Sequence, residues 1–130
     1  MQDSVFTKII KGEIPCHKVY EDDRAIAFMD INPVQPGMVL IVPKLQIDHF
    51  MDLPDEDYQA LMSALKKIAA KMRQVFPDKR VGVQIEGLDV PHAHIKAFPI
   101  SSADDFRALP NTNTDPNHPA LAQMAKKLSI

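Results

Sequence analysis

The sequence predicts an α+β fold in which helices back an antiparallel sheet of about five strands. The main observation is one long amphipathic helical pattern with short strand-like runs on both sides of it. The order along the chain is helix, three strands, helix, two strands, helix, without an internal repeat. The predicted strands cover residues 18–21, 24–29, 38–42, 80–86 and 92–98.

A short helix is predicted near the N-terminus. Ser4 is a suitable N-cap, because its hydroxyl can accept a hydrogen bond from a backbone N–H of the first turn. Phe6, Ile9 and Ile10 share one apolar face, and Gly12 is a residue type that ends helices. We therefore expect this helix to lie with that face on the sheet.

The three strands that follow begin with a predicted hairpin. Residues 18–21 and 24–29 are separated by two aspartates, a spacing typical of a tight connection. Residues 38–42 form a continuous apolar run between Gly37 and Pro43. A strand that is apolar on both faces is covered on both faces, so we expect this run at the centre of the sheet.

The most regular pattern begins at Pro54 or Asp55 and reaches about Phe76, just before Pro77. Its methionines are read as core filler, because Met adapts to irregular gaps in a hydrophobic core. The apolar stripe consists of Tyr58, Leu61, Met62, Leu65, Ile68, Ala69, Met72, Val75 and Phe76.

The last thirty residues change in composition. Residues 101–119 are rich in Ser, Asp, Asn, Pro and Thr and show no hydrophobic period, so a long surface connection is predicted. A final helix is predicted over about residues 119–128. Its apolar side consists of Leu121, Met124, Ala125 and Leu128.

Composition limits the class of protein. A chain of 130 residues with 45% apolar and 25% charged residues is sufficient for one globular domain. The formal net charge of −2 argues against a nucleic-acid groove, whereas a small anionic ligand needs only local donors. No apolar run approaches the ~18 residues of a membrane span, so we expect a soluble, cytoplasmic protein without a membrane partner. The single Cys16 excludes an intrachain disulfide and is read as a packing residue.

The residues with most chemical potential lie between residues 92 and 96. If this segment is extended, His92, His94 and Lys96 lie on one face, with Ala93 and Ile95 on the other. Neighbours on that face are roughly 6.5–7 Å apart. The spacing suits one nucleophile or base flanked by two groups that bind the same anion.

Two simpler interpretations remain open for this segment. A polar face on an antiparallel strand is often only the solvated side of a sheet. A His-x-His pair can also bind a metal ion, but a complete site needs further ligands. The other histidines, His17, His49 and His118, are scattered singly in the sequence, so no metal site is predicted.

Five segments of the chain, taken together and in order, resemble the histidine-triad (HIT) family, and within it the Hint-like branch. The segments are FTKIIKGEIP (6–15), VYEDD (19–23), AFMDINP (27–33), LIVPK (40–44) and PHAH (91–94). The resemblance implies a HIT-like domain over residues 1–100, with its sheet backed by a long helix and a short N-terminal helix. Residues 101–130 would form a C-terminal extension, a surface loop and a short helix, packed on the same domain.

The resemblance also implies the activity. Its members are nucleotide hydrolases or transferases that cleave a bond at the α-phosphate of a nucleotide through a covalent nucleotidyl-histidine intermediate, and they usually act as homodimers. The expected substrate is a derivative of a purine nucleoside monophosphate, such as a phosphoramidate, and no cofactor is expected. One further local observation supports a dimer, because an open five-stranded sheet has an edge that must be covered or paired.

The resemblance implies roles for individual residues. His94 matches the nucleophile, His92 matches the histidine that orients it, and Asp30 matches the acid that binds the ribose hydroxyls. Without the family, Asp30 reads equally as a turn residue before Asn32, and the apolar residues read as core. The positions that match the apolar base and ribose pocket are Val5, Phe6, Ile9, Phe28, Ile31 and Leu40.

The chain also departs from the family pattern. Lys96 stands where the third histidine is usual, and the Gly-Gln-Ser/Thr segment that supplies phosphate donors is missing. Gln84 or Ile85 occupies the position of a common asparagine contact to phosphate. Some relatives bind a structural zinc ion through two cysteines and two histidines. Here the first three of those positions hold Ser4, Thr7 and Gln46, so no structural zinc is expected.

Three functions are consistent with these features. The leading hypothesis is a nucleotide phosphoramidase, the second a dinucleoside polyphosphate hydrolase, and the third a nucleotide-binding protein with reduced or lost catalysis. Lys96 either binds the phosphate that His94 attacks or extends into solvent as part of a degenerate triad.

Overall fold

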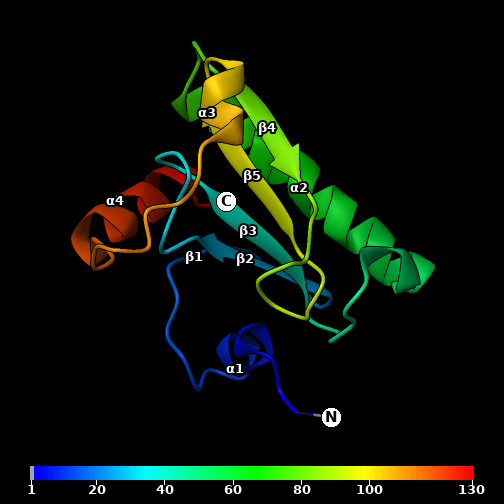
Figure 1. Ribbon diagram of the computed structural model, residues 1–130. Coiled ribbons are helices and arrows are strands. Elements are labelled where there is room, and N and C mark those ends of the chain that lie inside the picture. Colours follow the sequence, from blue (N-terminus) through cyan, green and yellow to red (C-terminus); the bar gives the residue numbers. More distant parts are fainter. Residues whose placement is uncertain (1) are drawn as a thin grey trace.

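The computed structural model describes residues 2–130 and shows an α+β fold, as predicted, with helices on both faces of a five-stranded antiparallel sheet (Figure 1). The strand order is β1-β2-β3-β5-β4, so the apolar run after Gly37 lies at the centre of the sheet. The elements are α1 (Val5–Ile10), β1 (Lys18–Glu21), β2 (Ala25–Met29), β3 (Val39–Pro43), the 3₁₀ turn η1 (Phe50–Asp52), α2 (Asp55–Val75), β4 (Arg80–Gln84), β5 (Ile95–Ile100), α3 (Ala103–Arg107) and α4 (His118–Leu128).

The two central strands β2 and β3 are buried along their whole length. Because successive side chains of a strand point to opposite faces, each strand contributes to two separate hydrophobic clusters. Ala27 and Ile41 face the larger cluster, whereas Phe28 and Leu40 face the smaller one. A continuous apolar run is therefore required here, because neither face of these strands meets solvent.

Different helices cover the two faces. The long helix α2 lies across the sheet, and α4 packs beside it, with Leu61, Ile68 and Leu128 in the larger cluster. The short helix α1 covers the other face, where Phe6 packs in the smaller cluster (Figure 1). Ser4 caps α1 as predicted, since its hydroxyl accepts a hydrogen bond from the Thr7 N–H. The face under α1 is the one that carries the candidate site.

Two element predictions are wrong. β5 begins at Ile95, three residues later than predicted, because the residues before it turn away from the sheet, with the His92 N–H donating to the Val90 carbonyl. The polar segment 101–119 is not a featureless connection, since it contains the helix α3, capped by Ser102. The aromatic residue of this segment, Phe106, stacks on Phe98 of β5, a contact that no periodicity could indicate.

Over residues 2–130, none of the helices combines the length and the apolar character that crossing a membrane requires.

Gly37 allows a close approach of the β2–β3 connection to α2 and β5. Its φ is +93°, and a Cβ atom there would lie 3.0 Å from the Phe76 ring and 3.3 Å from Pro99. We expect Gly37→Ala to lower the free energy of unfolding by about 2–3 kcal/mol, from left-handed backbone strain and this contact together. Urea denaturation measures the loss.

Gly12→Ala is the matched control for this prediction. Gly12 also has a positive φ of +80°, but a Cβ there would have no atom within 4 Å. It should lose only the backbone contribution of about 1–2 kcal/mol. Equal losses in the two variants would show that the contact with Phe76 contributes nothing.

Candidate active site

A cavity of about 640 Å³ lies between α1 and the face of the sheet that α1 covers. The structure brings nine of the residues singled out from the sequence together around it, although they come from separate elements along the chain. These are Val5, Phe6, Ile9, Phe28, Asp30, Ile31, Leu40, His94 and Lys96. The wall is apolar around the helix and polar at the end where Asp30 and Lys96 lie. Further lining comes from Ile14, Pro15, Cys16, His17, Met29, Asn32, Asp89, Val90 and His118.

His94 is held in one defined orientation at the wall of this cavity. Its Nδ1 lies 2.7 Å from the backbone carbonyl oxygen of His92. Because a carbonyl can only accept, Nδ1 carries the proton and Nε2 keeps a free lone pair. The edge of the Phe6 ring packs at 5.0 Å between centroids. Burial lowers the pKa of His94, helped by the nearby charge of Lys96, so the imidazole is neutral and nucleophilic near pH 7.

His92 does not stand in a row with His94 and Lys96, so the predicted three-residue face is wrong. It precedes β5, is fully buried and does not line the cavity. Its Nε2–H donates to the Pro43 carbonyl at 2.8 Å, so its Nδ1 accepts from the Ser4 hydroxyl at 2.7 Å. Burial lowers the pKa of His92 and favours this neutral form. It is the backbone carbonyl of His92, rather than its ring, that fixes the tautomer of His94.

The other residues at the positions of the zinc ligands meet at His92. The Gln46 side-chain oxygen accepts hydrogen bonds from the Ser4 backbone N–H at 2.9 Å and from the Thr7 hydroxyl. The Thr7 backbone N–H donates to the Ser4 hydroxyl at 3.0 Å. Hydroxyl and amide oxygens are poor zinc ligands compared with thiolate and imidazole. The four side chains therefore connect α1 to the site through hydrogen bonds among themselves.

Lys96 faces the cavity, and its side chain is only 13% exposed. The ammonium forms ion pairs with Glu86 at 2.8 Å and with Asp89 at 3.6 Å. Burial alone would lower the pKa of Lys96, but the hydrogen bond with Glu86 and the neighbouring carboxylates outweigh it, so the pKa is raised. Lys96 is thus a fixed cation beside His94. Its side chain does not extend into solvent, which was the alternative interpretation.

Asp30 lies at the polar end of the cavity, at the end of β2. Burial raises the pKa of its carboxyl group, against the lowering effect of the Asn32 backbone N–H, which donates to it at 2.8 Å, and of Lys96 and His94. The hydrogen bond to Asn32 is the local contact expected of a turn residue. The remaining acceptor positions of this half-buried carboxylate can receive donors from a ligand in the cavity.

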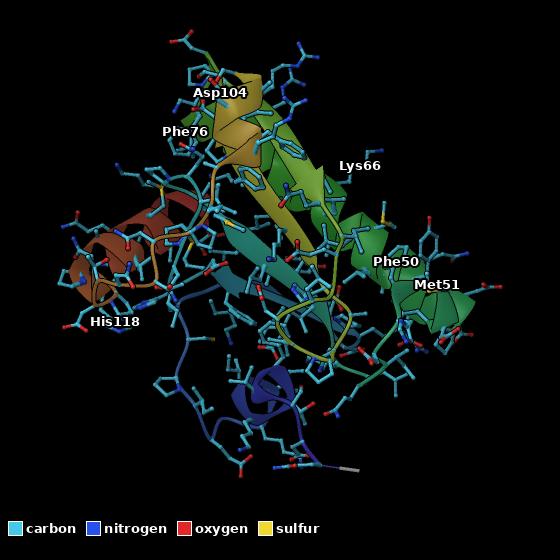
Figure 2. The ribbon with its side chains drawn as sticks, in the orientation of Figure 1. Phe50, Met51, Lys66, Phe76, Asp104 and His118 are labelled. Carbon is cyan, nitrogen blue, oxygen red and sulfur yellow. The ribbon has the colours of Figure 1, made fainter. Side chains whose placement is uncertain are left out.

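His17 and His118 were read as isolated, and that interpretation is wrong. Their rings lie side by side, with Nε2 of His17 2.9 Å from Nδ1 of His118, at the edge of the same cavity. His118 opens α4, and Figure 2 shows it at the end of the helix nearest the connection from α3. The two are 101 positions apart in sequence, so only the packing of α4 on the sheet brings them together. No spacing rule could have found this pair.

Comparison with known proteins identifies the family. The HIT domain family matches residues 11–101. Protein hit of Bacillus subtilis is 33% identical over 126 residues, which is 91% of this chain and 86% of that protein. The adenylylsulfatase HINT3 of Arabidopsis thaliana is 32% identical over 107 residues, 78% of this chain and 54% of that protein. The crystal structure of a Hit-like protein from Bartonella henselae agrees with a TM-score of 0.84 at 31% identity, covering 97% of this chain and 93% of that one.

The chain therefore belongs to the HIT family, whose members are generally nucleotide-binding hydrolases or transferases. The predicted family and fold class are both confirmed.

Proposed function

We propose that this protein is a nucleotide phosphoramidase that releases a nucleoside monophosphate through a covalent nucleotidyl-His94 intermediate. The observation that supports this most directly is the hydrogen bond from His94 Nδ1 to the His92 carbonyl, which leaves an unprotonated Nε2 at the wall of the cavity. The apolar wall suits a base and ribose, and the relative from Arabidopsis carries the name adenylylsulfatase, which fits a nucleotide substrate.

The reaction proceeds in two displacements at the α-phosphorus. In the first, the Nε2 lone pair of His94 bonds to phosphorus and the bond to the leaving nitrogen breaks. That nitrogen keeps the electron pair, takes a proton from water and departs as an amine. In the second, water attacks phosphorus, the bond to Nε2 breaks, the electron pair returns to the imidazole and one proton passes to solvent. One water is consumed for each monophosphate and amine released.

Two further residues act on the bound nucleotide in this proposal. Asp30 accepts hydrogen bonds from the ribose hydroxyls through the acceptor positions that the Asn32 N–H does not use. Lys96 places a fixed positive charge near the phosphate attacked by His94, where negative charge develops in the transition state. This second contribution replaces part of the donor set that the missing Gly-Gln-Ser/Thr segment would provide.

The proposal is tested with an adenosine 5′-phosphoramidate as substrate and chromatography of released AMP as the readout. We expect the parent to release AMP and His94→Ala to reduce release below detection, because in this proposal His94 supplies the attacking nitrogen. His49→Ala is the matched control and should retain full activity, since the His49 side chain is 70% exposed and does not line the cavity. Tight AMP binding by the parent without turnover would instead identify a binding protein.

Lys96 gives a second prediction. Lys96→Met should lower kcat/KM for the phosphoramidate by at least ~10-fold, because it removes a cation from the transition state. Lys96→His should retain or improve kcat/KM. Removing this cation also raises the pKa of His94, so the acid limb of the pH–rate profile should move to higher pH in Lys96→Met.

The control for Lys96 is Lys66→Met on the exposed side of α2, where Figure 2 shows Lys66 directed away from the sheet. This variant should behave as the parent. A Lys96→Met protein with parental kcat/KM would assign catalysis to the histidines alone.

Homodimerisation is part of the same proposal. β4 lies at the edge of the sheet; Val83 within it is 39% exposed, and Ile85, the residue after its end, is 44% exposed. The opposite edge is partly covered, because the Ile130 N–H donates to the Val19 carbonyl of β1. An exposed apolar edge strand is a natural pairing site for a second copy. Sedimentation should show a dimer at micromolar concentration, and a monomer alone would contradict the proposal.

A further inference from the structure

A second cavity, of about 550 Å³, adjoins the first. The two share Asp30, Asn32, Asp89 and Lys96, so they meet at the polar end of the first cavity. His94 lines the first cavity and not the second. The remaining wall of the second cavity comes from β4 and the residues after it, from the β2–β3 connection, and from residues 107–112 of the C-terminal extension.

The extension is held in place at this cavity by α3. Phe106 stacks on Phe98 with 5.6 Å between ring centroids, and it lies over Gly82, where a Cβ would come within 2.8 Å of its ring. The side-chain amide of Gln84 donates to the Phe106 carbonyl at 3.3 Å. The amide of Gln35 donates to the Asp105 carbonyl at 3.2 Å.

These contacts come from β4, β5 and the β2–β3 connection, and they hold the C-terminal end of α3. They therefore determine where Arg107 lies. Figure 1 shows α3 beside β4 and β5, and Figure 2 shows Asp104 on it at the outer end of the sheet. The next turn of chain passes back along the second cavity.

The geometry of displacement at phosphorus indicates which part of the substrate each of the two cavities would hold. In a displacement at phosphorus, the attacking atom and the leaving atom lie on opposite sides of the reacting centre. If the nucleoside occupies the first cavity and His94 attacks from its wall, the leaving group points away from His94. The space available there is the second cavity, reached past Lys96.

The charges of the second cavity indicate what it would bind. The Lys96 ammonium is already paired with Glu86 and Asp89. Arg107 is exposed, lines the second cavity as well as the neighbouring cavity beside Arg80, and forms no ion pair within 4.0 Å among residues 2–130. A guanidinium on a cavity wall binds carboxylate or phosphate oxygens in a bidentate manner. An anionic group on the leaving amine would pair with the Arg107 guanidinium.

We propose that the second cavity is the leaving-group subsite, and that Arg107 of the C-terminal extension selects leaving amines that carry an anionic group. This inference rests on the proposed function for its orientation. It assigns a role to residues 101–112, for which the sequence indicated none. The bond changes are those of the two displacements given above, with the departing amine being the one that Arg107 binds.

The test uses four adenosine 5′-phosphoramidates that differ only in the amine. Alanine carries a carboxylate, 1-aminoethylphosphonate a phosphonate, alaninamide no charge and 1,2-diaminopropane a cation. For the parent, kcat/KM should be ~10-fold higher with an anionic amine than with alaninamide, a factor equivalent to about 1.4 kcal/mol. The alanine and phosphonate compounds separate carboxylate from phosphate-like recognition.

Binding is measured in parallel on His94→Ala, which cannot consume the compounds. The dissociation constants should show the same ~10-fold preference for an anionic amine. Recognition can therefore be judged even if the parent releases no AMP, so failure of the proposed function and failure of the subsite give different results.

Arg107→Met should reduce the preference for alanine over alaninamide to about one, and Arg107→Lys should retain part of it. Phe106→Ala should also reduce the preference, because it removes the stack that holds α3 on β5. The matched control is Arg73→Met, on the exposed side of α2 and outside both cavities, which should keep the parental preference.

A parental preference for alaninamide or diaminopropane would overturn the proposal, because the carboxylates of Glu86 and Asp89 would then dominate the cavity. An unchanged preference in Arg107→Met would do the same.

Discussion

The site depends on the two hydrogen bonds made by the buried ring of His92. The ring donates to the Pro43 carbonyl at the end of β3 and accepts from Ser4 at the start of α1, so it joins three distant parts of the chain. Both ring nitrogens are thereby hydrogen-bonded, which holds the segment before β5 against β3 and α1. The His92 carbonyl then receives the Nδ1–H of His94. A residue that does not line the first cavity thereby determines which nitrogen of His94 carries the proton.

The same arrangement explains why the cavity is bounded by α1. Ser4 caps the helix and also binds His92, so the start of α1 is tied to the site by the hydroxyl that initiates it. Phe6 follows two residues later and packs its ring against both His92 and His94. The apolar wall and the His94 ring are therefore positioned by one short segment. Thr7 and Gln46 complete the hydrogen bonds around Ser4.

Charge is distributed unevenly across the polar end of the site. Lys96 is a cation in this region, and two carboxylates from the preceding loop hold it. That pairing fixes the ammonium in place but also offsets its charge, so a second cation gains importance. Arg107 supplies it from the extension, and α3 is held there by stacking and by two side-chain amides. The extension thus contributes to the same region as the HIT domain.

Much of this protein could be read from residue order alone. The apolar pattern identified α2 and the central strand, and turn residues located the hairpin, because these signals are local. Linked motifs indicated the family and the residues around the first cavity, because they are shared by relatives. Three features were decided by tertiary structure. His92 does not lie in the predicted row, because its ring nitrogens form hydrogen bonds with the Pro43 carbonyl and the Ser4 hydroxyl instead of with solvent. α3 is held on the sheet by the stacking of Phe106 on Phe98, and His17 contacts His118, which is 101 positions away in the sequence. Tertiary contacts of this kind leave no period or spacing in the sequence, so only the packed chain could establish them.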